Sequence, residues 1–154
     1  MNRGSPLGRP ALAVVMSNYR FFMLEVTEDA VVARAVDQHL QGTTLAELIK
    51  LELMQIIESM PDKNLVIDFQ NVKLVSSSVI SSLLGVKRYL TAAQRSMKLC
   101  SMTDSLRHVF KTLNMDGTVF EICDTIQDAL KSAGRGVSYY DVVGQVSPPD
   151  EENA

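Results

Sequence analysis

The sequence predicts a single α/β domain in which strands and helices alternate after an opening β-hairpin. Its 154 residues suit one domain, and 46% of them are hydrophobic, which is enough for one core. Short β-branched runs alternate with segments of helical periodicity along the chain. This alternation favours a mixed, mostly parallel sheet joined by right-handed crossovers, in the order β-β-α-β-α-β-α-β-α.

The strands are predicted from short apolar runs. Residues 20–26 and 30–36 flank a polar turn at 27–29 and are expected to form a hairpin. Residues 37–42, which precede the first helix, are expected to form a loop. The later strands are expected at residues 65–69, 97–100 and 118–122.

The first helix is expected to begin at Thr43 or Thr44, and Glu47 occupies the capping-box position relative to Thr44. The stripe expected to be buried consists of Leu45, Leu48, Ile49, Leu53, Ile56, Ile57 and Met60. Leu51 and Met54 fall outside this stripe. They are either isolated surface residues or part of a contact with a partner.

Three further helices are predicted. The second covers residues 77–93, and the third is capped by Thr103 or Asp104. The third helix has an apolar stripe made of Leu106, Val109, Phe110 and Leu113. The fourth begins at residue 124 or 125 and continues through Leu130.

The two ends of the chain differ in composition from its centre. Residues 16–133 are expected to form the domain, between a disordered leader (1–15) and a flexible acidic tail (134–154). The apolar run at residues 10–16 is too short to span a bilayer. No direct membrane insertion is therefore expected.

The charge and the cysteine content indicate which class of partner is excluded and which cellular compartment is expected. The net charge is −3 and the basic residues are scattered, which argues against nucleic acid as a partner. Cys100 and Cys123 lie in apolar runs and are expected to be buried thiols in a reduced compartment. This predicts a cytoplasmic protein, although a disulfide between the two cysteines stays open.

The motifs of common enzymes are missing. The sequence contains no Gly-x-Ser-x-Gly elbow and no Gly-rich phosphate loop. His39 is expected in a loop and His108 on the polar side of a helix, so both are predicted to be solvated. Cys100 and Cys123 lack the paired spacing of a metal site. The sequence therefore predicts a protein that is not an enzyme and holds no metal or cofactor.

The most unusual junction is the serine run Ser76-Ser77-Ser78, at the predicted start of the second helix. Unpaired N–H groups and a partial positive charge at a helix N-terminus suit a capping hydroxyl and tolerate a phosphate. The run therefore has two interpretations, either a helix cap alone or a site of phosphorylation.

The surrounding segment LVIDFQNVKLVSSSVISSLLG resembles the centre of STAS domains, whose best-known members are bacterial anti-sigma factor antagonists. In that family a strand with an acidic residue near its end leads to Asp-Ser-Ser-Gly-Leu-Gly at a helix start. Asp68 corresponds to the strand acid, Ser77 to the serine that is phosphorylated in antagonists, and Ser78 to the residue after it. The resemblance extends from about residue 20 to residue 131.

Two positions depart from the family pattern. Ser76 replaces the loop aspartate, and Val79 replaces the glycine after the serine pair. A β-branched residue restricts the tight turn or close approach that glycine permits, so recognition by a kinase of the family type is expected to be altered.

The resemblance implies a transcription-regulating, protein-binding switch. An antagonist binds a GHKL-type anti-sigma factor kinase, which phosphorylates the serine, and a PP2C-type phosphatase restores it. The expected phosphorylation site is Ser77, with Ser76 and Ser78 as alternatives. The expected partner-binding residues are Asp68, Ser76, Ser77, Ser78, Val79 and Ser81.

Two alternatives remain open alongside the switch. The first is a constitutive STAS scaffold of the stressosome or transporter-associated type, and the changes at Ser76 and Val79 favour it. The second is a sensor that binds a nucleotide or lipid at the same strand ends. The protein is expected to be a monomer or a weak dimer.

Overall fold

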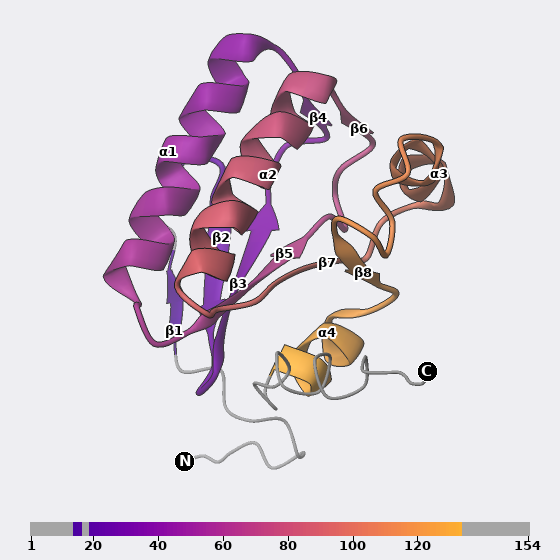
Figure 1. The fold of residues 1–154 in the computed structure, drawn as a ribbon. Coiled ribbons are helices and arrows are strands. Elements are labelled where there is room, and N and C mark those ends of the chain that lie inside the picture. Colours follow the sequence, from indigo (N-terminus) through magenta and orange to yellow (C-terminus); the bar gives the residue numbers. More distant parts are fainter. Residues whose placement is uncertain (1–13, 17–18, 134–154) are drawn as a thin grey trace, which may run out of the picture.

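The computed structural model describes residues 14–16 and 19–133, and these form an α/β domain (Figure 1). Its strands are β1 (Val14–Met16), β2 (Phe22–Val26), β3 (Ala30–Ala35), β4 (His39–Leu40), β5 (Asn64–Asp68), β6 (Leu74–Val75), β7 (Met97–Cys100) and β8 (Glu121–Cys123). Its helices are α1 (Thr43–Ser59), α2 (Ser77–Ala92), α3 (Asp104–Thr112) and α4 (Ile126–Ala133).

The main sheet has the strand order β1-β2-β3-β5-β7-β8. β1, β2 and β3 pair antiparallel, whereas β3, β5, β7 and β8 pair parallel. The predicted hairpin and the mixed, mostly parallel sheet are therefore confirmed. β4 and β6 form a separate parallel ladder of two strands, which the sequence analysis did not predict.

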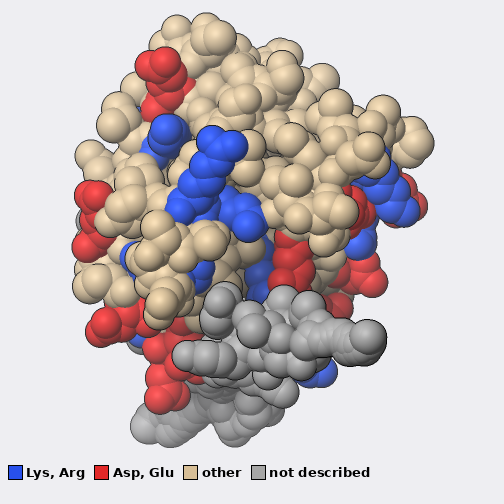
Figure 2. Space-filling view, viewed as in Figure 1, with Lys and Arg blue, Asp and Glu red and all other residues tan. Residues whose placement is uncertain are grey.

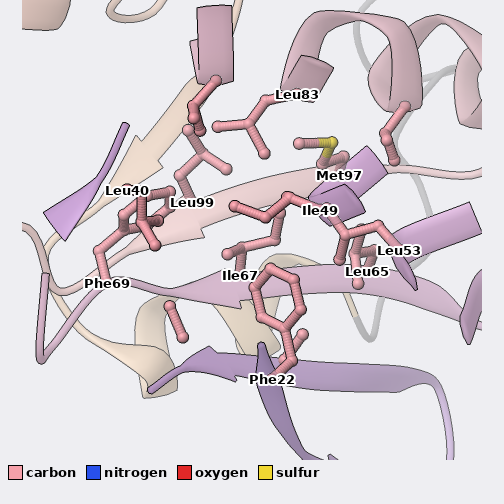
Figure 3. Close-up of a cluster of buried hydrophobic side chains, with 14 of the residues drawn as sticks. Phe22, Leu40, Ile49, Leu53, Leu65, Ile67, Phe69, Leu83, Met97 and Leu99 are labelled. Atoms are coloured by element: carbon pink, nitrogen blue, oxygen red, sulfur yellow. The ribbon is translucent and has the colours of Figure 1, made fainter. Parts of the chain in front are cut away.

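Helices cover both faces of the sheet. α1 and α2 lie side by side on one face, and α4 packs against β5, β7 and β8 on the other (Figure 1). In the core under α1 and α2, Ile49, Leu53 and Leu83 meet the sheet residues Ile67 and Leu99 (Figure 3). A smaller cluster under α4 contains Val32, Val66, Cys100 and Ala129.

The start of α1 differs from the prediction. Gly42 is the N-cap, with φ 100° and ψ 148°, and no side chain caps the helix. A φ of this sign favours glycine. Because Thr43 and Thr44 already lie inside the helix, the predicted threonine cap and the capping box with Glu47 were wrong. Leu48, expected in the buried stripe, is 43% exposed.

The C-terminal half shows two further corrections. β8 begins at Glu121 rather than 118, because Val119 and Phe120 donate their N–H groups to the Met115 carbonyl in a tight turn. On α3, only Leu106 and Phe110 of the predicted stripe are buried. Val109 and Leu113, the other two, are 38% and 48% exposed.

The remaining boundaries lie close to those expected. β7 covers the predicted residues, and α2 ends one residue before the predicted end. Val14 and Val15 lie in β1, so a strand begins inside the segment expected to be a leader. Residues 1–13 and the predicted tail lie outside the described residues.

A buried carboxylate joins α1 to the start of β2. Glu52 is 8% exposed and accepts hydrogen bonds from the backbone N–H groups of Arg20, Phe21 and Phe22 at 3.0, 2.8 and 3.1 Å. These donors precede or begin the strand, where the sheet ladder does not yet satisfy all of them. Glu52 therefore fixes where the hairpin meets the helix layer.

We expect Glu52→Ala to lower the free energy of unfolding by about 2–3 kcal/mol, because it leaves the N–H groups of Phe21 and Phe22 buried without an acceptor. Glu58 on the same helix is exposed, and Glu58→Ala is the matched control, with an expected change within about 0.5 kcal/mol. Urea denaturation followed by circular dichroism measures both. Equal losses for the two variants would contradict the role of Glu52.

Candidate functional site

The parallel strand ends bring two loops together beside the serine run. β5 ends at Asp68, and the chain then turns through the bond from Val72 N to Phe69 O (2.9 Å). β6 pairs with β4, and Ser76 N donates to Leu40 O at 2.9 Å. The loop before α1 therefore lies directly beside the start of α2, although Leu40 and Ser76 are 36 positions apart in sequence.

The three serines differ in their hydrogen bonds. Ser76 is the N-cap of α2, and its Oγ accepts from Val79 N at 3.4 Å. The hydroxyls of Ser76 and Ser78 lie 3.1 Å apart and share a hydrogen bond. Ser77 is exposed, and its hydroxyl makes no hydrogen bond within the described residues. Of the three, Ser77 is the one that can be modified without breaking a bond.

Two of the predicted contact residues are buried. Asp68 and Val79 both have an exposed fraction of 0%, so neither side chain offers a surface to a partner. Asp68 Oδ2 accepts from Arg34 Nε at 2.8 Å, and its Oδ1 accepts from Gln70 N at 2.9 Å. The bond to Asp68 raises the pKa of Arg34. Asp68 thus holds the turn after β5 rather than facing outward.

A shallow groove between α1 and α2 extends the site, and its volume is about 670 Å³. Ser78 and Ser81 line it from α2, and Glu47, Lys50 and Leu51 line it from α1. These α1 residues are not among the site residues predicted from the sequence. The signal that could have found them was the position of Leu51 and Met54 outside the buried stripe.

The floor of the groove is fixed by a bond between the helices. The buried Ser82 hydroxyl donates to the Ala46 carbonyl at 2.8 Å, so α1 and α2 are held at a constant separation. Small residues on α2 allow the approach, and the Lys50 side chain lies across Gly85. The buried Ser82 is therefore part of the packing between the two helices.

Charge is sparse around the start of the two helices. Figure 2 shows a largely uncharged surface over the upper part of the molecule, where α1 and α2 begin in the view of Figure 1. Neither helix has an acidic residue in its first turn. The N-terminal partial charges of these helices are therefore not neutralised by neighbouring carboxylates.

The two cysteines lie next to each other in neighbouring parallel strands. Cys100 of β7 is the Cα partner of Cys123 of β8, and both are free thiols. Burial raises the pKa of Cys100 to about 12 and also raises the pKa of Cys123. Within the described residues, no group of three or more His, Cys, Asp or Glu side chains could hold a metal ion.

The cap predicts a difference between neighbouring serines. We expect Ser76→Ala to lower the free energy of unfolding by about 0.5–1 kcal/mol, because it removes the side-chain cap of α2. Ser77→Ala is the matched control and is expected to change it by less than about 0.5 kcal/mol. Denaturant titration of both variants measures these free energies of unfolding. A larger decrease for Ser77→Ala than for Ser76→Ala would refute the assignment of the cap.

Cys100 predicts a loss of stability in alkali. Its folded pKa of about 12 lies above the ordinary value of 9.0, so the unfolded thiol ionises first as pH rises. The stability contributed by the neutral buried thiol is present below pH 9.0 and is lost as pH rises towards about 12. Denaturant midpoints over this window should fall more steeply for wild type than for Cys100→Ala. Parallel curves would show that burial does not control this thiol.

Comparison with known proteins identifies the family. The STAS domain model matches residues 23–129. No curated protein matches the chain. In the part of the chain that the structure describes, no helix is long and apolar enough to cross a membrane.

Solved structures share the fold at low identity. The Thermotoga maritima protein TM1081 is 16% identical, with a TM-score of 0.65 over 79% of this chain and 95% of that one. Unphosphorylated SpoIIAA, an anti-sigma factor antagonist, is 23% identical, with a TM-score of 0.56 over 75% and 99%. Phosphorylated SpoIIAA, a Bacillus cell fate determinant, is 24% identical, with a TM-score of 0.53 over 71% and 96%. The match to the family model covers more than half of the chain, and the protein therefore belongs to the STAS domain family.

Proposed function

We propose that this protein is a non-enzymatic interaction module of the anti-sigma factor antagonist type, switched by phosphorylation of Ser77. The observation that carries the proposal is the position of Ser77, which is exposed at the first residue of α2 and has no hydrogen bond within the described residues. The proposed partner is an anti-sigma factor that is also a GHKL-type serine kinase. A PP2C-type phosphatase reverses the modification.

The local electrostatics support a phosphate at this position. The first turn of α2 contains no acidic residue, and its N–H groups and helix dipole favour a negative charge. A phosphate adds about 1.5–2 negative charges, which interact favourably with the start of the helix. The same charges oppose binding, because they repel a docked partner and must lose their hydration at the interface. Binding is lost while the fold is retained. The chain aligns with the unphosphorylated and phosphorylated forms of SpoIIAA at similar TM-scores, 0.56 and 0.53.

The hydrogen bonds favour Ser77 over its neighbours. Phosphorylation of Ser76 would remove the hydroxyl that caps Val79 N, and phosphorylation of Ser78 would break its bond to Ser76. Ser81 is exposed one turn further along α2 and extends the proposed contact surface into the groove. Asp68 is buried, and its bond to Gln70 N holds the turn that follows β5.

A constitutive scaffold is the second candidate. Leu48 and Leu51 are 43% and 60% exposed on α1, which favours a lasting contact that needs no modification. The chain also aligns with 18% of the length of the murine anion transporter Slc26a9, with a TM-score of 0.57 and 13% identity. A scaffold would keep its partner whatever the state of Ser77.

The decisive experiment combines phosphorylation mapping with binding by variants. Protein isolated from its native cells is expected to carry phosphate at Ser77 when analysed by mass spectrometry. The tagged Ser77→Asp variant should recover the anti-sigma factor at least about tenfold less than wild type, a change of about 1.4 kcal/mol in binding.

Two matched controls separate charge from position. Ser77→Asn keeps the size of the aspartate without its charge, and Ser105→Asp places the same charge at an exposed serine in the first turn of α3. Both are expected to bind like wild type. If Ser77→Asp also binds like wild type, the switch is excluded and the scaffold is favoured.

A further inference from the structure

A cation from α1 lies where α2 lacks a side chain. A Cβ added to Gly85 of α2 would lie 2.9 Å from Lys50 Nζ and 3.0 Å from Lys50 Cε. The amine of Lys50 is therefore held close to the backbone of α2 at this position. Lys50 is exposed, and it forms no ion pair or hydrogen bond within the described residues. The amine is thus available to an anion that reaches it from α2.

Ser81 lies one helical turn before this amine. It precedes Gly85 by four residues on α2, and Cβ positions at that spacing are about 5–6 Å apart on the same side of a helix. Ser81 and Lys50 both line the groove between α1 and α2. A group that lengthens the Ser81 side chain by a few ångströms therefore reaches the amine of Lys50.

The three serines that line the groove differ in what their hydroxyls already bind. Ser78 shares a hydrogen bond with Ser76, and the buried Ser82 donates to the Ala46 carbonyl. Ser81 is exposed, and its hydroxyl makes no hydrogen bond in the part of the chain that the structure describes. Of the three, Ser81 is the one that can be modified without breaking a bond.

We propose that Ser81 is a second phosphorylation site, and that its phosphate binds the ammonium group of Lys50 across the groove. The phosphoryl donor is a nucleoside triphosphate held by a protein kinase. Ser81 Oγ bonds to the γ-phosphorus as the bond from that phosphorus to the bridging oxygen breaks. The nucleoside diphosphate leaves, and the hydroxyl proton passes to a base of the kinase. The product carries about 1.5–2 negative charges at neutral pH.

The arrangement has the order of charges that a helix favours. An anion at position i and a cation at i+4 attract each other on a helix surface. In α2 the i+4 position after Ser81 is Gly85, and Lys50 supplies the cation there from the neighbouring helix. The phosphate therefore links α1 to α2, and the bond from Ser82 to Ala46 fixes the separation over which it acts.

One charge in the groove opposes the phosphate. Glu47 and Lys50 are the two charged residues of the groove lining, and Glu47 lies one turn before Lys50 on α1. Its carboxylate repels a phosphate on Ser81, whereas Lys50 attracts it. The two residues therefore give opposite predictions for any property that depends on the charge of the phosphate.

A phosphate on Ser81 would change the surface beside the proposed switch. It would fill part of the groove and lie one turn after Ser77 on α2. Unlike a phosphate on Ser77, it would have a cation from its own chain to pair with. The inference does not depend on modification of Ser77, and the two proposals can fail separately.

Mass spectrometry of the protein from its native cells tests whether the site is used. Trypsin cleaves after Lys73 and Lys87, so one peptide, residues 74–87, contains both the serine run and Ser81. Fragment ions from cleavage between Ser78 and Ser81 separate the two sites. Phosphate is expected on Ser81. Phosphate confined to residues 76–78, or absent from this peptide, would overturn the proposal. Phosphate on Ser81 without any on Ser77 would support it and count against the switch.

A double-mutant cycle tests the pairing with Lys50. Full-length protein with phosphoserine incorporated at position 81 is compared with unmodified protein, each with and without Lys50→Gln. The substitution should lower the melting temperature of the phosphorylated protein by at least about 2 °C more than that of the unmodified protein, because only the former loses an ion pair. Lys50→Arg should keep the pairing. Equal effects of Lys50→Gln on both proteins would overturn the proposal.

A matched control places the phosphate elsewhere. Ser105 is exposed in the first turn of α3, outside the groove. With phosphoserine at position 105, Lys50→Gln should change the melting temperature by the same amount as in the unmodified protein. An additional loss as large as that at position 81 would show that Lys50 acts through the overall charge, and would overturn the specific pairing.

The second pKa of the phosphate gives an independent readout. It is about 6 for an ordinary phosphoserine. Because a nearby cation favours the doubly charged form, ³¹P NMR titration should give a lower pKa for phosphoserine at position 81 in otherwise wild-type protein than in Lys50→Gln. Glu47→Gln should lower it further. One and the same pKa in all three proteins would show that the phosphate does not meet these groove residues, and would overturn the proposal.

Discussion

The parallel pairing of β3 with β5 determines where the serine run lies. Arg34 of β3 is in register with Asp68 of β5, so both strands end at the same edge of the sheet. Right-handed crossovers then place α1 and α2 on the same face, with both N-termini at that edge (Figure 1). The ladder between β4 and β6 fixes the two loops to each other. The opposite end of α1 is closed by Arg95, which donates to the carbonyls of Ile57 and Met60.

The two departures from the family pattern have different structural consequences. Ser76 replaces an aspartate but still caps α2 through its hydroxyl, so the helix start is preserved. Val79 replaces a glycine with a side chain that has no exposed surface and packs in the core under α2. The valine therefore changes the packing beneath the site rather than the surface that a partner meets. In the proposed function, the loss of a negative charge at Ser76 is then the larger change for a kinase.

Much of the fold could be predicted because the helices repeat their apolar pattern over several turns and the strands between them are short apolar runs. The second helix and the strand Met97–Cys100 were located to within a residue. β4 and β6 contain two residues each, too few for any periodicity, and they exist only because two distant loops meet. The start of α1 depends on the backbone conformation of Gly42. The sequence did not reveal it, because the adjacent Thr43 is also a common helix cap. The position of Ser77 was predictable from local sequence, whereas the contribution of Lys50 and Leu51 required knowing that α1 lies beside α2.

The scarcity of charge around the serine edge is what would make a single phosphate effective there. On a surface crowded with carboxylates and lysines, two further negative charges are a small fraction of the field and are screened within about 8–10 Å. Around the N-termini of α1 and α2 the surface is largely uncharged, so a phosphate on Ser77 would dominate the local potential (Figure 2). A partner matched to the neutral hydroxyl of Ser77 would have no cation placed to receive the phosphate. Burying the phosphate against that partner would then leave a charge without compensation, which costs far more than the hydroxyl contact contributes.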